Sequence, residues 1–141
     1  MITTNVGAGN FYVKTQDPFG EWSDPIRVPE VGGIDPSIFF DEDGKAYVVN
    51  NDEAPDFKAE YDGHRTIRVQ EFDWKNDKMV GSRKIIVNKG VHPEEKPIWI
   101  EGPHMYKING KYYLMDAEGG TSVNHSEVIF RSDSPWGPFK A

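Results

Sequence analysis

Two acidic residues stand at equivalent places in a motif that occurs twice in the chain. Asp35 lies nine positions before Gly44, Glu101 lies nine positions before Gly110, and a lysine follows each glycine. The two copies are 66 residues apart, and each continues into a short aromatic and aliphatic run. A duplicated scaffold that presents one carboxyl group per copy suits acid–base chemistry on sugars, because cleavage of a glycosidic bond uses paired carboxyl groups.

Composition bounds the class of protein. The 141 residues are 37% hydrophobic, which is enough apolar material for one core of ordinary domain size. A net charge of −7 argues against nucleic acid and against an anionic membrane as partner, because both would be repelled, and favours a neutral ligand. The chain has no cysteine, so it can form neither a disulfide nor a thiolate metal site.

The start of the chain predicts neither a secretory signal nor a spanning helix, because it has no basic region followed by an apolar run. As given, we expect the chain to stay in the cytoplasm. If Met1 is not the natural start, a secreted parent protein is equally compatible with the sequence.

Strand patterns dominate the sequence, and no segment has a helical stripe of apolar residues. The pairs Asp43-Gly44 and Asn109-Gly110 favour the positive φ angles of tight hairpin turns. Short runs of β-branched and aromatic residues predict strands near residues 10–13, 37–40, 46–49, 65–72, 84–87, 112–115 and 128–130.

A second repeat defines the units. Residues 15–22 match residues 132–139 at an offset of 117, with proline, aromatic residue, glycine and aromatic residue in the same places. The chain therefore divides into the end of one unit at 1–25, a complete unit at 26–90 and a further unit at 91–141. Units of four short strands are the blades of a propeller, so we predict an all-β partial propeller of about two and a half four-stranded antiparallel blades.

Two and a half blades cannot close into a ring, so blade faces are expected to remain partly exposed and to associate. One hypothesis is a homo-oligomer in which two copies approach a five-blade ring, and light scattering that showed a stable monomer would exclude it. The other is that the missing blades lie in sequence outside this chain. The residues expected on such faces are Phe39, Phe40, Val48, Val49, Tyr113 and Met115.

The motifs at 33–47, 101–121 and 124–126 resemble glycoside hydrolase family 43, which contains β-xylosidases, α-L-arabinofuranosidases and arabinanases on a five-bladed β-propeller. The resemblance implies that Glu101 is the general acid and that Asp35 orients it and adjusts its pKa. It also implies that Thr121 lines the sugar pocket. The family's general base, an aspartate of the first blade, matches no residue of this chain, and neither do the first-blade aromatic wall and the late histidine and arginine.

The chemistry of inversion explains why these residues matter. One carboxylic acid protonates the leaving oxygen while a carboxylate about 6.5–9.5 Å away activates water on the opposite face of the sugar. Asp35 would raise the pKa of Glu101 by repulsion between like charges, which leaves the base to a third carboxylate. The resemblance implies a pentose-containing oligosaccharide as substrate and no organic cofactor; a calcium ion on the propeller axis is a family feature for which the chain shows no identifiable ligands.

Aromatic residues and histidines near the motifs have two interpretations each. Trp99 is two residues before Glu101 and is expected to line a pocket, whereas Trp22, Trp74 and Trp136 are expected in the core. Of the histidines, His104 and His125 either contact the sugar or pack within a blade, and His64 and His92 are expected on the surface.

The acidic run Asp41-Glu42-Asp43 is expected to be a solvated hairpin tip, because the spacing and the later glutamate of a calcium loop are missing.

Three functions remain open at this stage. The first is a glycosidase that is a fragment or half-propeller, and the second is a catalytically inactive sugar-binding or self-assembling module. The third, a five-bladed fructan hydrolase, is disfavoured because Ile34 stands where an arginine is usual and Gly102 where a cysteine is usual.

Overall fold

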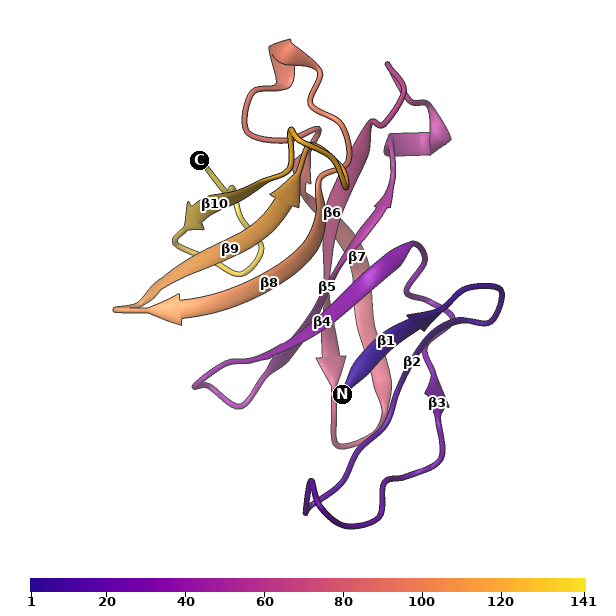
Figure 1. Ribbon diagram of the computed structural model, residues 1–141. Helices are drawn as coiled ribbons and strands as arrows, with labels where there is room; N and C mark the ends of the chain where they lie inside the picture. The colour runs from indigo at the N-terminus through magenta and orange to yellow at the C-terminus, as the bar shows by residue number, and fades with distance from the viewer.

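The computed structural model describes residues 1–141 and is built of ten strands and two short 3-10 turns (Figure 1). All strands pair antiparallel within three sheets. The elements are β1 (Ile2–Asn5), β2 (Gly9–Tyr12), β3 (Ile26–Arg27), β4 (Ile34–Phe40), β5 (Ala46–Glu53), η1 (Pro55–Phe57), β6 (Arg65–Asp73), β7 (Lys78–Asn88), η2 (Pro93–Glu95), β8 (Glu101–Ile108), β9 (Lys111–Glu118) and β10 (Ser126–Ser132).

The first sheet has the order β1-β2-β3, the middle sheet β4-β5-β6-β7 and the third β8-β9-β10. Each sheet follows the chain order, as in a meander, and the prediction of an all-β antiparallel protein is confirmed. The first sheet ends at Arg27, two residues past the boundary that the repeats place at residue 25. No helix of the chain is long and apolar enough to cross a membrane.

Turn chemistry explains the hairpins. Asn109 and Gly110 both have positive φ angles, of 50° and 74°, as a tight turn between β8 and β9 requires. Gly44 has a φ of 86° in the corresponding turn between β4 and β5. Both glycines of the repeated motif therefore lie in hairpin turns, although Ile108 pairs with Lys111 across two residues and Phe40 pairs with Ala46 across five.

Two apolar clusters join the sheets. The first and middle sheets share Tyr12, Val48 and Phe72, while the middle and third sheets share Val49, Ile67 and Leu114. Because neighbouring residues of a strand face opposite sides, Val48 and Val49 are buried against different sheets. The prediction that these two valines are partly exposed is therefore wrong, whereas Phe40 is exposed, at 59%.

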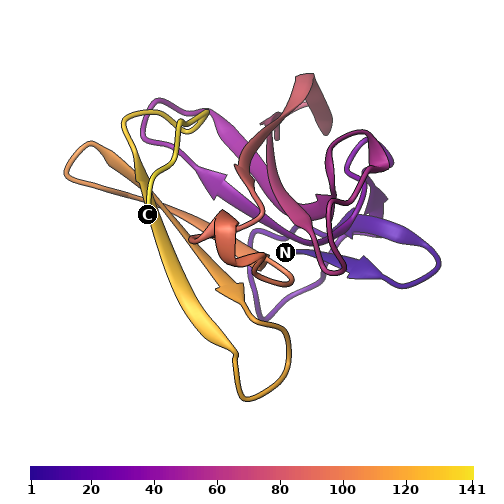
Figure 2. The same cartoon turned by 90° about the horizontal axis from the view of Figure 1, so that it is seen from above.

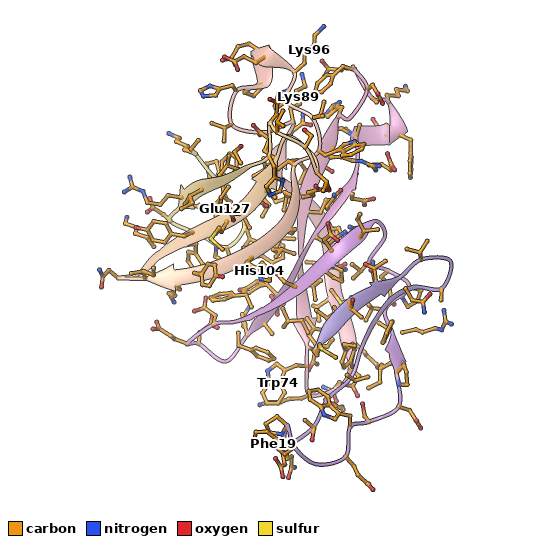
Figure 3. All side chains as sticks on the ribbon, in the orientation of Figure 1. Phe19, Trp74, Lys89, Lys96, His104 and Glu127 are labelled. Carbon is orange, nitrogen blue, oxygen red and sulfur yellow. The ribbon has the colours of Figure 1, made fainter.

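Burial of the tryptophans divides them. Trp136 packs against the core and meets the ring of Tyr47 edge-on at 5.5 Å, as predicted. Trp22 and Trp74 are 43% and 42% exposed, so the prediction of core positions is wrong for them. Figure 3 shows Trp74 at the lower end of the molecule, together with the exposed Phe19.

Two further surface predictions are corrected by buried hydrogen bonds. His64 is only 3% exposed, because its ring stacks on Tyr61 and its Nε2 lies 2.7 Å from Oδ1 of Asn88. Asp41 is also buried at its hairpin tip, where it accepts hydrogen bonds from Lys107 at 2.6 Å and from the hydroxyl of Tyr112.

The Asp41 cluster ties the middle sheet to the third. Burial by itself would raise the pKa of Asp41, but the hydrogen bonds from Lys107 and Tyr112 favour the charged form and hold that pKa below its ordinary value. The prediction of a solvated hairpin tip is thus wrong for Asp41, which joins the two sheets, and confirmed for Glu42 and Asp43, which are exposed.

The first strands of the middle and third sheets, β4 and β8, lie next to each other. The hydroxyl of Ser37 donates to the carbonyl oxygen of Pro103 at 2.6 Å, and these residues are 66 apart, like the two motif acids. Seen from above, the middle and third sheets diverge from this contact (Figure 2). The connections that carry η1 and η2 lie together at the upper end of Figure 1, where β8 begins.

Candidate active site

Matching irregularities in β4 and β8 position the two acids. Between Ile34 and Ser37 the strand advances three residues while its partner advances two, from Asn51 to Val49. The same occurs in β8, between Glu101 and His104. A bulge of this kind re-aims side chains at the end of a strand, and here each bulge begins beside the acid of its motif.

The backbone around the acids is in conformations that are costly for ordinary residues. Asp35 has a φ of 53° and Trp99 a φ of 52°, both in the left-handed region. The Asp35 conformation is held from both sides: its N–H donates to Oγ1 of Thr4 at 3.2 Å, and its Oδ2 accepts from the N–H of Gly102 at 3.3 Å. The carboxylate of Asp35 therefore reaches the residue next to Glu101.

Glu101 has the electrostatics of an acid catalyst. Burial, and then the charge of Asp35, raise the pKa of Glu101 above its ordinary value, while His125 and Arg65 act in the opposite direction. A raised pKa keeps a larger fraction of Glu101 protonated near neutral pH, which is the form that can protonate a leaving oxygen.

Trp99 is fixed between two loops. Its backbone N–H donates a hydrogen bond to the carbonyl oxygen of Gly63 at 2.8 Å. On the other side, a Cβ on Gly120 would stand 3.0 Å from the Trp99 ring, so the absence of a side chain there lets the ring approach. The Trp99 side chain is still 44% exposed, and it lines a pocket of about 250 Å³.

The loop between β9 and β10 carries Thr121 and His125, which are both exposed. Nδ1 of His125 lies 3.0 Å from the carbonyl oxygen of Gly120, and the charge of the imidazolium lowers the pKa of Glu101. The charge of His125 therefore acts on Glu101.

His104 is exposed on β8, and Figure 3 shows it at the side of that strand that faces β4. It lines a different pocket, of about 490 Å³, which extends to Trp22 and Trp74 and includes neither motif acid. The prediction that His104 acts together with the other site residues thus has no common pocket to support it.

Sequence reasoning missed the connection between β5 and β6. Tyr61, His64 and Arg65 surround the pocket beside Trp99, and the charge of Arg65 acts on Glu101. The available signal was a tyrosine, a histidine and an arginine concentrated within five residues between two strands.

No three histidine, aspartate or glutamate side chains are arranged to hold a metal ion. The chain therefore identifies no side-chain ligands for a calcium ion on the propeller axis.

The description "Glycosyl hydrolases family 43" belongs to a family model that matches residues 1–141. A xylosidase/arabinosidase of Butyrivibrio fibrisolvens is 47% identical over 135 residues, which are 94% of this chain and 25% of that protein. This chain thus spans about a quarter of the length of that relative.

Solved structures agree with this result. The crystal structure of a GH43_12 protein retrieved from a capybara gut metagenome is 54% identical, with a TM-score of 0.93 over 99% of this chain and 26% of that one. A xylan β-1,4-xylosidase from Bacillus halodurans is 38% identical, with a TM-score of 0.78 over 93% of this chain and 24% of that one. The three antiparallel sheets are accordingly those of a partial β-propeller.

Proposed function

This chain belongs to glycosyl hydrolase family 43, and we propose that it supplies the acid side of an inverting glycoside hydrolase that releases pentoses from plant polysaccharides or their oligosaccharides. The observation that carries the proposal is the pair of bulges that bring Asp35 beside a half-buried Glu101. The names of the relatives, xylosidase/arabinosidase and xylan β-1,4-xylosidase, support a β-xylosidase or α-L-arabinofuranosidase.

In the proposed reaction, Glu101 donates its proton to the glycosidic oxygen as the bond from that oxygen to the anomeric carbon breaks. A water molecule attacks the anomeric carbon from the opposite face and inverts its configuration. The carboxylate that deprotonates this water is not assigned to any residue of this chain. Because the leaving sugar departs with the proton of Glu101, the raised pKa of Glu101 bears directly on the rate.

Asp35 is proposed as a positioning residue. Its charge contributes to the raised pKa of Glu101, and its bond to Gly102 steadies the bulge at which Glu101 stands. Thr121, Trp99 and His125 are proposed to contact the sugar, since they lie on the segments around Glu101. His104 is proposed with them only because it is near Glu101 in the sequence.

The proposed architecture is half of a five-bladed propeller. The sequence offset of 117 aligns β2 with β10. Because β10 is the third strand of its sheet, β2 corresponds to the third strand of a blade and β1 to the second. The three sheets then hold three, four and three strands, ten in all, which at four strands per blade make two and a half blades. In the proposed division the first unit reaches Arg27 instead of residue 25 so as to include β3, and the other two units correspond to the middle and third sheets.

The test replaces Glu101 with glutamine, which keeps the shape of the side chain and cannot donate the acidic proton. We expect release of nitrophenol from a β-xyloside or an α-L-arabinofuranoside to fall about 10²–10⁴-fold. A parallel series of assays contains sodium azide, because azide is a nucleophile that needs no general base and can replace the activated water. Glu94→Gln, an exposed residue of η2, is the matched control and should keep the wild-type rate. An unchanged rate in Glu101→Gln refutes the proposal.

The second candidate is a catalytically inactive sugar-binding or self-assembling module. It is favoured by apolar residues left exposed on the third sheet, among them Tyr106, Ile108 and Ile129 at 45%, 56% and 56%. Pentose binding without turnover at any pH, with or without azide, would select this function, and a dimer in light scattering would support the homo-oligomer.

A further inference from the structure

The first sheet holds the backbone that carries Asp35. Strand β1 lies against β4, the strand that contains Asp35 (Figure 1). On β1, Thr4 is opposite Asn10 of β2, so the two side chains lie on the same face of the sheet. The hydroxyl of Thr4 donates to Oδ1 of Asn10 at 2.6 Å and accepts from the backbone N–H of Asp35 at 3.2 Å. Thr4 therefore links Asn10 to the backbone of Asp35.

Asn10 also holds the turn that leads to Asp35. It is 4% exposed, and its Nδ2 donates to the carbonyl oxygens of Val31 at 2.7 Å and of Gly33 at 3.2 Å. Gly33 has a φ of 69°, and a Cβ there would stand 2.0 Å from the carbonyl oxygen of Asn51, so the turn lies directly against β5. Because buried polar groups are costly to leave unpaired, these hydrogen bonds leave the turn little freedom to move.

A buried ion pair supports the same turn from the middle sheet. Asn50 is 1% exposed; its Nδ2 donates to the carbonyl oxygen of Gly32 at 2.6 Å, and its Oδ1 accepts from Arg83 at 2.7 Å. Arg83 also pairs with Asp52 at 2.8 Å. A Cβ on Gly32 would stand 3.4 Å from Nη1 of Arg83, so the turn passes over this ion pair. Side chains of β2, β5 and β7 thus fix the segment that precedes β4.

Asp35 needs this support because its backbone conformation is unfavourable by itself. Its φ of 53° lies in the left-handed region, and the ring of Pro36 favours extended conformations for the residue before it. In the observed conformation, Oδ2 of Asp35 accepts from the N–H of Gly102 at 3.3 Å. A change of φ at Asp35 would swing its carboxylate away from Gly102.

We propose that Thr4 is a positioning residue for the acid: together with Asn10 it keeps Asp35 in its left-handed conformation, and thereby keeps the carboxylate of Asp35 at Gly102, beside Glu101. The inference rests on the proposed function, in which Glu101 is the acid. Burial is the largest cause of the raised pKa of Glu101 and the charge of Asp35 is the next, so release of Asp35 should lower this pKa. A hydroxyl of the first sheet thus acts on a carboxyl group of the third.

Thr4→Val tests the hydroxyl, because valine has nearly the same shape and can form neither hydrogen bond. Two NMR signals are followed, the amide of Gly102 and the carboxyl ¹³C of Glu101. We expect solvent exchange of the Gly102 N–H to become about two- to tenfold faster, the usual effect of losing one hydrogen bond, and the pKa of Glu101 to fall. Thr4→Ser keeps the hydroxyl and should restore both signals.

Thr3→Val is the matched control. Thr3 is the neighbour of Thr4 on β1, and its exposed side chain faces away from Asn10, so the same substitution should leave both signals in place. A second comparison excludes a merely structural role. Because Thr4 acts through the charge of Asp35, Thr4→Val should not lower the pKa of Glu101 further when it is combined with Asp35→Asn. Preserved dispersion of the amide spectrum shows that each variant is folded.

The proposal requires both signals to change in Thr4→Val, and it is overturned if either stays at its wild-type value. A pKa of Glu101 that falls equally with and without the charge of Asp35 also overturns it, and so does Thr4→Ser if it behaves like Thr4→Val. Turnover separates this inference from the proposed function. Unchanged turnover in Glu101→Gln refutes the acid, whereas the Gly102 signal decides independently whether Thr4 holds Asp35.

Discussion

Replacing Asp116 by asparagine and by leucine separates two costs of a buried carboxyl group. Asp116 is on β9, on the same face as the core residue Leu114, and is 0% exposed. Neither of its carboxyl oxygens has a hydrogen-bond partner. Burial, and then the charges of Glu127 and Glu118, raise the pKa of Asp116 well above its ordinary value of 3.8. We therefore expect the native state to keep the proton of this residue to higher pH than the unfolded chain does.

The sign of the pH effect follows from proton counts. Above about pH 4 the unfolded chain has lost the proton of this residue while the native state keeps it, so the free energy of unfolding falls as the pH rises toward the native pKa. Asparagine does not titrate, so Asp116→Asn should remove this slope and gain on the wild type as the pH increases.

The size of the polar cost comes from the missing partners. A buried polar group without a hydrogen bond costs about 1–3 kcal/mol. Leucine has a similar shape and removes the polar atoms as well as the charge. Asp116→Leu should therefore raise the free energy of unfolding by about 1–3 kcal/mol at neutral pH, about a 5–150-fold increase in the ratio of folded to unfolded protein.

Urea denaturation followed by tryptophan fluorescence at about pH 5, 7 and 9 measures both effects. Asp133→Asn is the matched control: its side chain is 83% exposed, so the change should stay within about 0.5 kcal/mol. The reasoning is refuted if Asp116→Leu is less stable than the wild type at every pH, or if Asp116→Asn keeps the wild-type dependence on pH.

Two further substitutions test ionised groups. Asp35→Asn removes a charge that raises the pKa of Glu101, so the pKa of Glu101 in carboxyl ¹³C NMR and the basic limb of the pH–rate profile should both move to lower pH; an unmoved Glu101 signal would contradict the assigned cause. Lys107→Met leaves Asp41, whose side chain is 2% exposed, without its cationic partner and should cost about 3–5 kcal/mol in urea denaturation. Because the native pKa of Asp41 is lowered, this loss should be full above about pH 4 and shrink as Asp41 is protonated; an equal loss at all pH values would show that packing dominates.

Local sequence predicted seven of the ten strands, all except β1, β3 and β8, and the positions of both hairpin turns. Asn109-Gly110 adopts the positive φ angles predicted for it, whereas at Asp43-Gly44 only the glycine does, so the prediction is wrong for Asp43. The two bulges were beyond such reasoning. They depend on contacts between segments distant in sequence, such as the bond between Asp35 and Gly102, which no pattern within one motif contains.

Burial of side chains could not be predicted from local sequence either, as the repeat at residues 15–22 and 132–139 shows. Phe19 and Trp136 occupy equivalent positions, 117 residues apart, yet Phe19 is 98% exposed and Trp136 packs against the core. The two segments have the same sequence pattern, but Trp136 packs against the ring of Tyr47 in the adjacent sheet. A repeat predicts the conformation of a segment, but only the tertiary arrangement decides whether its apolar side chains are covered.

The different tasks proposed for the two motif acids also arise from their surroundings. Asp35 is exposed and accepts a hydrogen bond from the Gly102 N–H. Glu101 is less exposed, and burial and its neighbour's charge both favour the protonated form. The raised pKa of Glu101 thus has two causes, its burial and the charge of Asp35. Exposing Glu101 to water would lower this pKa even if Asp35 stayed in place. The proposed role of Glu101 as an acid therefore depends on the burial of its side chain as well as on the charge of Asp35.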